Sequence, residues 1–134
     1  MDAQDKRIEK ILGSECERNS ENALKYLDHL QKNTKAFCIL TGVEDFPWEE
    51  PYVMGGRSQK EYEKLKKNNP SHTDQFELIE LLPPENDENE IIGKVKRKTD
   101  QKIFTIGLSW LEDTDKGSRN YQLLHDYSVW HINY

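Results

Sequence analysis

The strongest constraint on the fold is a pair of alternating segments in the last third of the chain. Residues 91–98 and 101–108 both alternate apolar with polar side chains, and only Thr99 and Asp100 separate them. Alternation with a period of two places one face of a strand against a core, and a two-residue connection joins antiparallel neighbours. The pattern therefore predicts a β-hairpin.

Two earlier segments also have the character of strands. Residues 36–43 form a continuous apolar run that is long enough for a buried strand and too short for a helix. Residues 76–82 predict a further strand, which a pair of prolines ends. After the hairpin, we expect residues 109–111 to continue its second strand into a loop over 112–117. The chain thus predicts about four antiparallel strands.

Helical periodicity appears at both ends of the chain. Residues 3–12 place apolar side chains at helical spacing, and a second helix is predicted between an N-cap at Asn19-Ser20 and its end at Asn33. The apolar face of this second helix is expected to be Ala23, Leu24, Leu27 and Leu30, with Tyr26 alongside. Near the C-terminus, a stripe with a spacing of three predicts one side of a last helix: Tyr121, Leu124, Tyr127 and Trp130.

Together these elements predict one α+β domain over residues 1–134. It has helices at about 3–33, a β core at about 36–111 with a helical insertion at about 58–68, and a C-terminal helix at about 119–132. We expect a small antiparallel sheet curled as an SH3-like barrel, with two N-terminal helices and a short C-terminal helix.

Composition limits the classes of function. The 134 residues carry 25 acidic and 19 basic side chains, a net charge of −6, which argues against a nucleic-acid surface. Three Trp, six Tyr and four Phe indicate a folded domain with a small, aromatic core. The sequence shows no apolar core of a signal peptide and no run of membrane-spanning length. We expect a cytoplasmic protein and favour a monomer.

Two acidic clusters carry the functional prediction. The first surrounds two aromatic side chains and a proline at residues 44–50, and the second runs through 74–90 without a Lys or Arg. Dense carboxylates repel one another unless solvent, a cation or a basic partner relieves them. One interpretation is a solvated acidic loop; the other is calcium, which takes six to eight oxygen ligands. The candidate metal ligands are Glu44, Asp45, Glu49, Glu50, Asp87, Glu88 and Glu90.

Familiar sites are not found in the sequence. An EF-hand starting at Asp87 would place Ile91 and Ile92 where an oxygen ligand and a glycine are required. Residues 113–117 begin a similar pattern but favour a turn before the last helix. The four histidines lack zinc spacing, and no nucleophile elbow, P-loop or dinucleotide fingerprint occurs. We expect no catalytic residue, no organic cofactor and no enzymatic activity.

Three segments resemble a known family. They are Asn-Ala-Leu-Lys-Tyr-Leu at 22–27, Phe-Thr-Ile-Gly-Leu-Ser-Trp-Leu-Glu at 104–112, and the Tyr- and Trp-rich segment 120–130. In this order they are similar to the small cyanobacterial-type calcium-binding proteins of the CcbP family. The resemblance implies helices, an SH3-like core and a terminal helix with a Trp. It also implies calcium bound by clustered acidic side chains without an EF-hand. The chain departs from short family members by an insertion over 52–69.

We therefore predict a non-enzymatic, cytoplasmic calcium-binding protein acting as a buffer or sensor. The first acidic cluster should provide the main ligands, because its aromatics and prolines make the loop rigid, and the second should be weaker. The alternative is an acidic interaction module, of immunity or regulatory type, that binds a basic protein partner.

Overall fold

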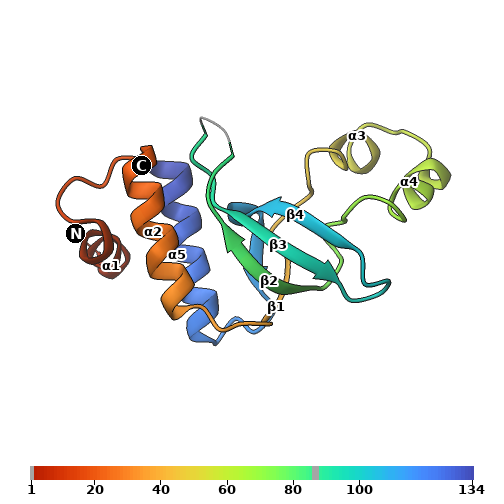
Figure 1. The fold of residues 1–134 in the computed structure, drawn as a ribbon. Coiled ribbons are helices and arrows are strands. Elements are labelled where there is room, and N and C mark those ends of the chain that lie inside the picture. The colour runs from red at the N-terminus through yellow and green to blue at the C-terminus, as the bar shows by residue number, and fades with distance from the viewer. Residues whose placement is uncertain (1, 86–87) are drawn as a thin grey trace.

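The computed structural model describes residues 2–85 and 88–134 (Figure 1). Its strands form one antiparallel sheet in the order β4-β3-β2-β1-β5. The predicted α+β class is confirmed. In chain order the elements are α1 (Ala3–Leu12), α2 (Ser20–Asn33), β1 (Ile39–Gly42), α3 (Glu50–Val53), α4 (Gln59–Leu65), β2 (Phe76–Leu82), β3 (Ile92–Arg97), β4 (Ile103–Gly107), the 3-10 turn η1 (Leu108–Trp110), β5 (Leu111–Asp113) and α5 (Arg119–Asn133).

The helices lie at two opposite ends of the sheet. Figure 1 shows α1, α2 and α5 gathered at one end together with both termini, and α3 and α4 projecting beyond the other end. Helix α5 packs on η1 and β5, and α2 packs on β2. We call the first part, with the sheet, the body, and residues 44–72 the arm. No helix in the described part of the chain is long and apolar enough to cross a bilayer.

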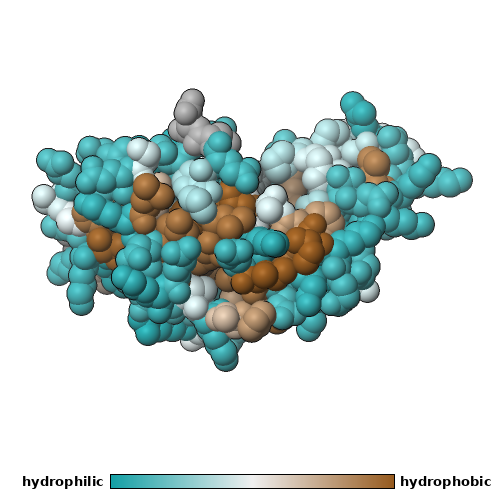
Figure 2. Space-filling model, in the orientation of Figure 1, coloured by the Kyte–Doolittle hydropathy of each residue, from teal (hydrophilic) through white to brown (hydrophobic). Residues whose placement is uncertain are grey.

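The body is built around aromatic contacts between α2 and α5. The ring centroid of Tyr26 lies 5.3 Å from that of Tyr127 and 5.2 Å from that of Trp130, and all three side chains are fully buried. The predicted C-terminal stripe is confirmed at its three buried positions. Leu24 is the exception on α2, with 53% of its surface exposed, because at 100° per residue it turns away from the face of Ala23 and Leu27. In Figure 2 hydrophobic residues gather across the middle of the molecule, over α2 and the sheet.

The hairpin and the preceding strand are confirmed, but the end of the hairpin was predicted wrongly. Beyond Gly107 the chain does not continue β4. Gly107 faces Ile92 at the start of β3, and the Leu108 N–H donates to the Ile91 carbonyl at 2.8 Å. Instead η1 turns the chain, and β5 pairs with β1, with Thr41 opposite Glu112. The sequence therefore contains a fifth strand that its local pattern did not predict.

The turn η1 connects the two edge strands of the sheet. Because only three residues separate β4 from β5, the sheet must curl to bring its edges near each other. No pairing in the described residues joins β4 to β5, so a closed SH3-like barrel is not confirmed.

The arm contains more helix than its prolines and glycines predicted. Between Phe46 and Gly56, where prolines and glycines favour irregular structure, α3 forms a single turn that starts at Glu50 and has Pro51 in its first turn, where proline is tolerated. The predicted helical insertion is confirmed as α4, whose N-cap Ser58 accepts a hydrogen bond from the Glu61 N–H.

Candidate functional site

A buried carboxylate fixes the base of the arm. Glu49 has no exposed surface, and its oxygens accept hydrogen bonds from the Tyr62 hydroxyl (2.5 Å), the Ser71 hydroxyl (2.8 Å) and the His72 N–H (2.8 Å). The Phe46 N–H donates to the same group at 3.2 Å. These bonds join the start of the arm to α4 and to its return, so Glu49 connects three segments of the arm.

The surroundings of Glu49 keep it ionised. Burial raises the pKa of Glu49, but the hydrogen bonds from Tyr62, His72 and Ser71 outweigh this and hold the pKa below its usual value. Burial and the bond to Glu49 raise the pKa of Tyr62 to about 12, so Tyr62 remains a donor. Glu49 is therefore a charged acceptor.

His72 bridges two of the four carboxylates of the first acidic cluster. Its Nδ1 lies 3.0 Å from Glu49 Oε1 and its Nε2 lies 3.2 Å from Asp45 Oδ1. The half-buried Trp48 adds a second anchor, because its indole N–H donates to the Pro70 carbonyl at 2.6 Å. Polar contacts as well as aromatic packing therefore hold this loop in place.

Arg97 closes the arm from the side of the hairpin. Its buried guanidinium donates to the carbonyls of Lys66, Lys67 and Asn69, and it pairs with Asp74 and Asp100. The hydrogen bond from Arg97 lowers the pKa of Asp100 to about 2. The buried charges of Glu49 and Arg97 therefore hold the arm near its start, at the end of α4 and where it returns to the sheet.

A second buried carboxylate, Glu90, fixes the turn between β4 and β5. It is 8% exposed and accepts from the Ser109 N–H (2.9 Å), the Ser109 hydroxyl (2.5 Å) and the Tyr127 hydroxyl (2.5 Å). Burial, and then the negative charge of Glu90, raise the pKa of Tyr127. Glu90 thus binds η1 to α5, and it explains why the chain turns after Gly107.

His131 completes this network at the surface of α5. Its Nε2 lies 3.4 Å from Glu90 Oε2, while its Nδ1 is buried and has no hydrogen-bond partner among the described residues. Burial lowers the pKa of His131, so the ring is neutral at neutral pH. A neutral ring that donates from Nε2 leaves Nδ1 as an unused acceptor.

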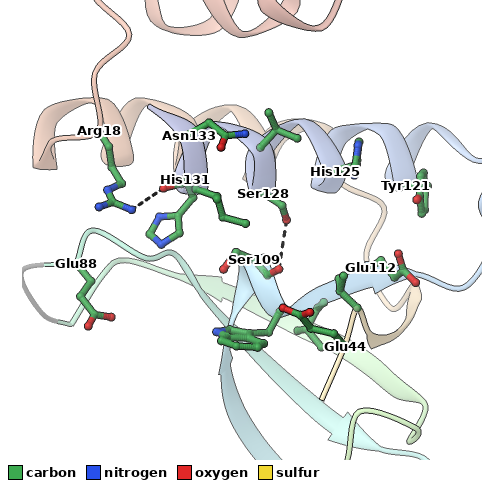
Figure 3. Close-up of a pocket in the computed structure, with 15 residues that line it drawn as sticks. Arg18, Glu44, Glu88, Ser109, Glu112, Tyr121, His125, Ser128, His131 and Asn133 are labelled. Carbon is green, nitrogen blue, oxygen red and sulfur yellow. Dashed lines mark hydrogen bonds between the residues drawn. The ribbon is translucent and has the colours of Figure 1, made fainter. Parts of the chain in front are cut away.

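Above this network lies a groove of about 730 Å³ between α5 and the η1–β5 segment (Figure 3). Its apolar part consists of Val43, Trp110, Leu111, Val129 and Ile132. Three carboxylates also line it: Glu44, Glu88 and Glu112. Figure 3 shows Glu44 and Glu112 on the strand side, opposite the side chains of α5, and Arg18 and Glu88 at the other end. The groove combines apolar surface with two of the predicted acidic residues, Glu44 and Glu88.

The structure divides the seven predicted ligands between several places. Glu44 and Glu88, one from each acidic cluster, line the same groove, and Glu90 lies beneath it beside Ser109. The other residues of the first cluster lie farther along the arm, where Asp45 and Glu49 contact His72 and Glu50 is exposed on α3. Asp87 lies outside the described residues. Across residues 2–85 and 88–134, no three Asp, Glu, His or Cys side chains are gathered closely enough to hold a metal ion as they stand.

Sequence reasoning missed three residues of these networks. Glu112 reaches the groove because β5 pairs with β1, and that long-range pairing has no local signal. His72 lies 23 positions from Glu49, and Arg97 lies 23 positions from Asp74, although its other partner, Asp100, is only three positions away. The one available signal for Arg97 was its place at an inward position of the alternating hairpin, where a charge needs a partner.

Comparison with known proteins supports the fold. No model of a known protein family matches the sequence, and no curated protein matches it. One similar solved structure is the crystal structure of Anabaena CcbP, with a TM-score of 0.61 and 15% identity, covering 95% of this chain and 87% of that one. Another, described as a calcium-binding protein in the calcium-binding form, has a TM-score of 0.61 and 15% identity, covering 96% and 89%. The resemblance to CcbP is thereby confirmed for the fold of nearly the whole chain.

Proposed function

We propose that this protein binds calcium through carboxylates on loops, without an EF-hand and without catalysis, as a buffer or sensor. The observation that carries the proposal is the shared fold over at least 95% of the chain with CcbP and with a protein described in a calcium-binding form. The net charge of −6 and the two acidic clusters supply ligands of the chemistry that calcium prefers.

The exposed carboxylates are the better candidates for ligands. Glu49 and Glu90 already accept several N–H and O–H donors, and a cation would have to displace these donors to bind there. Glu44 and Glu88 line the groove, where Glu112 adds a third carboxylate. Because calcium tolerates irregular coordination, carbonyl oxygens and water can complete such a site. Asp45, Glu50 and Asp87 remain predicted ligands.

Thermal unfolding in calcium tests the proposal. A ligand that binds only the folded state raises the melting temperature with the logarithm of its concentration. We expect this rise with calcium and a much smaller one with magnesium, which requires a tighter octahedron. Tryptophan fluorescence provides a second signal, since Trp110 lines the groove. An equal response to both ions, or none to calcium, would contradict the proposal.

Amide variants locate the site within the same assay. Glu44→Gln combined with Glu112→Gln removes two groove charges at nearly constant shape and should reduce the calcium response. Glu63→Gln combined with Glu80→Gln removes the same charge at exposed positions that do not line the groove, and it serves as the control. An equal loss in both variants would indicate diffuse attraction of the ion rather than a site at the groove.

The second candidate function is an acidic module that binds a basic protein. The acidic net charge favours encounter with a basic partner, and three carboxylates of the groove lie beside apolar surface. Retention of a purified basic protein at low salt, with loss of binding as salt rises, is the expected outcome. Retention that is unchanged between low and high salt would contradict it.

A further inference from the structure

Helix α5 has two different faces that carry large side chains. One face is the body core, with Leu124, Tyr127 and Trp130 fully buried. The other faces the groove and presents, in order, Tyr121, His125, Ser128, Val129 and Ile132. An ordinary surface helix keeps its second face polar. The groove face of α5 thus presents apolar side chains to the groove, and Ile132 is 69% exposed.

The groove runs along α5, and its two walls differ in the side chains they present. Residues 121–133 of α5 line it, which corresponds to roughly 18 Å of helix length. The opposite wall, formed by η1, β5 and the segment after β1, presents Trp110, Glu44 and Glu112. The α5 wall therefore combines apolar and aromatic side chains with polar ones, and the other wall adds carboxylates to an apolar floor. Arg18 also lines the groove, at the end away from Glu44 and Glu112.

We propose that this groove binds a basic amphipathic segment of a partner protein. Apolar side chains of the segment pack against Trp110, Val129 and Ile132, and its Lys or Arg side chains pair with Glu44 and Glu112. Charge complementarity selects this occupant, since both carboxylates stand on the strand wall and the whole chain carries −6. The groove length accommodates about 12 helical residues, the scale on which an amphipathic helix lays its apolar face into a groove. This proposal rests on the second candidate function and gives it a site.

The carboxylates proposed to pair with the segment are also candidate calcium ligands. If calcium takes Glu44 and Glu112, it removes the charges that the segment needs, so calcium and segment must compete. Binding of the segment is therefore measured first in a chelator, where it does not depend on the calcium proposal.

The test uses two fluorescein-labelled 12-residue peptides and the full chain. One carries Leu on one helical face and Lys on the other; the second replaces every Lys with Glu. Fluorescence anisotropy in chelator at low salt should show saturable binding of the Lys peptide only. Equal binding of the Glu peptide would overturn the proposal, and failure of every basic probe would overturn the acidic-module function with it.

Paired variants, in the groove and away from it, test whether the Lys peptide binds in the groove. Glu44→Gln with Glu112→Gln should weaken the Lys peptide about tenfold, the sum of two exposed charge pairs, and Ile132→Asp should weaken it by a similar factor. Glu63→Gln with Glu80→Gln, of equal charge, should change affinity less than twofold. If both double variants weaken binding equally, the basic-partner function stands and the groove is not its site. A dimer in sedimentation that Ile132→Asp dissociates would show that a second copy occupies the groove and would also overturn the proposal.

Discussion

The body and the arm of this molecule are held together by different forces. In the body, α2, α5 and the sheet bury a continuous set of apolar and aromatic side chains, including Tyr26, Tyr127 and Trp130. In the arm, Tyr62 is buried in contact with a charge, Glu49, and Arg97 joins the arm to the hairpin. The body therefore gains stability from apolar burial, whereas the arm depends on buried charges whose partners must all be present.

This difference in stabilising contacts predicts how each region unfolds when a side chain is removed. Loss of a core side chain should weaken the whole domain, because the core is shared between its elements. Loss of one charge should release α3 and α4 first, because the hydrogen bonds of Glu49 and Arg97 hold this part of the arm, whereas Phe46 at its start packs in the body core.

Trp130→Ala should have the largest effect. The ring is fully buried and its N–H donates to the Cys16 carbonyl at 2.7 Å, so its loss leaves a cavity and an unpaired carbonyl. We expect the free energy of unfolding to fall by about 3–5 kcal/mol, measured by urea denaturation. Ile132→Ala, two positions away but exposed, is the control and should cost under about 0.5 kcal/mol. A loss of similar size in both variants would contradict the assignment of the core to this face of α5.

Glu49→Gln should have the next largest effect, confined to the arm. The amide keeps the shape but replaces one acceptor oxygen with a donor, which opposes the Tyr62 and Ser71 hydroxyls. The local cost should be about 2–3 kcal/mol. Hydrogen exchange should accelerate over the arm while α2 and α5 remain protected.

Glu50→Gln is the matched control for this variant, since Glu50 is the exposed neighbour on α3. It should leave exchange in the arm unchanged. Uniform acceleration of exchange throughout the chain in Glu49→Gln would show that arm and body form one cooperative unit, against the comparison made above.

Acid should reproduce part of the Glu49→Gln effect. The folded state holds the pKa of Glu49 below the ordinary value of 4.5, so its contribution to stability is present above that value. The contribution is lost as the pH falls through the lower, folded pKa. Amide exchange in the arm, corrected for its intrinsic pH dependence, should therefore increase below about pH 4.5 before the body is affected. The Glu49→Gln variant should lack this step.

The two regions also differ in how well the sequence predicted them. Periodicity predicted α1, α2, β2, the hairpin and α5, because a helix or strand that buries one face repeats its apolar residues along the chain. It failed at Leu111–Asp113, where pairing with β1 rather than local pattern makes the strand. It also missed α3, where contacts of Glu49 with distant donors order a segment rich in prolines and glycines.

The candidate site was only partly predictable for the same reason. The two acidic clusters can be recognised in the sequence, and one residue of each, Glu44 and Glu88, lines the same groove. The sequence gives no sign of which carboxylates are buried by distant partners, so Glu49 and Glu90 looked equivalent to their exposed neighbours. Burial of a charge depends on donors such as Tyr62 and Tyr127, which lie 13 and 37 positions away.

We propose that exposed carboxylates bind calcium while the buried ones maintain the fold. Carbon-13 NMR of the glutamate side-chain carboxyls during a calcium titration tests it most directly, because each carboxyl reports its own ligand. We expect the Glu44 and Glu88 signals to shift with calcium and saturate, whereas those of Glu49 and Glu90 keep their positions. Shifts confined to Glu49 and Glu90, or no carboxyl shift at saturating calcium, would contradict it.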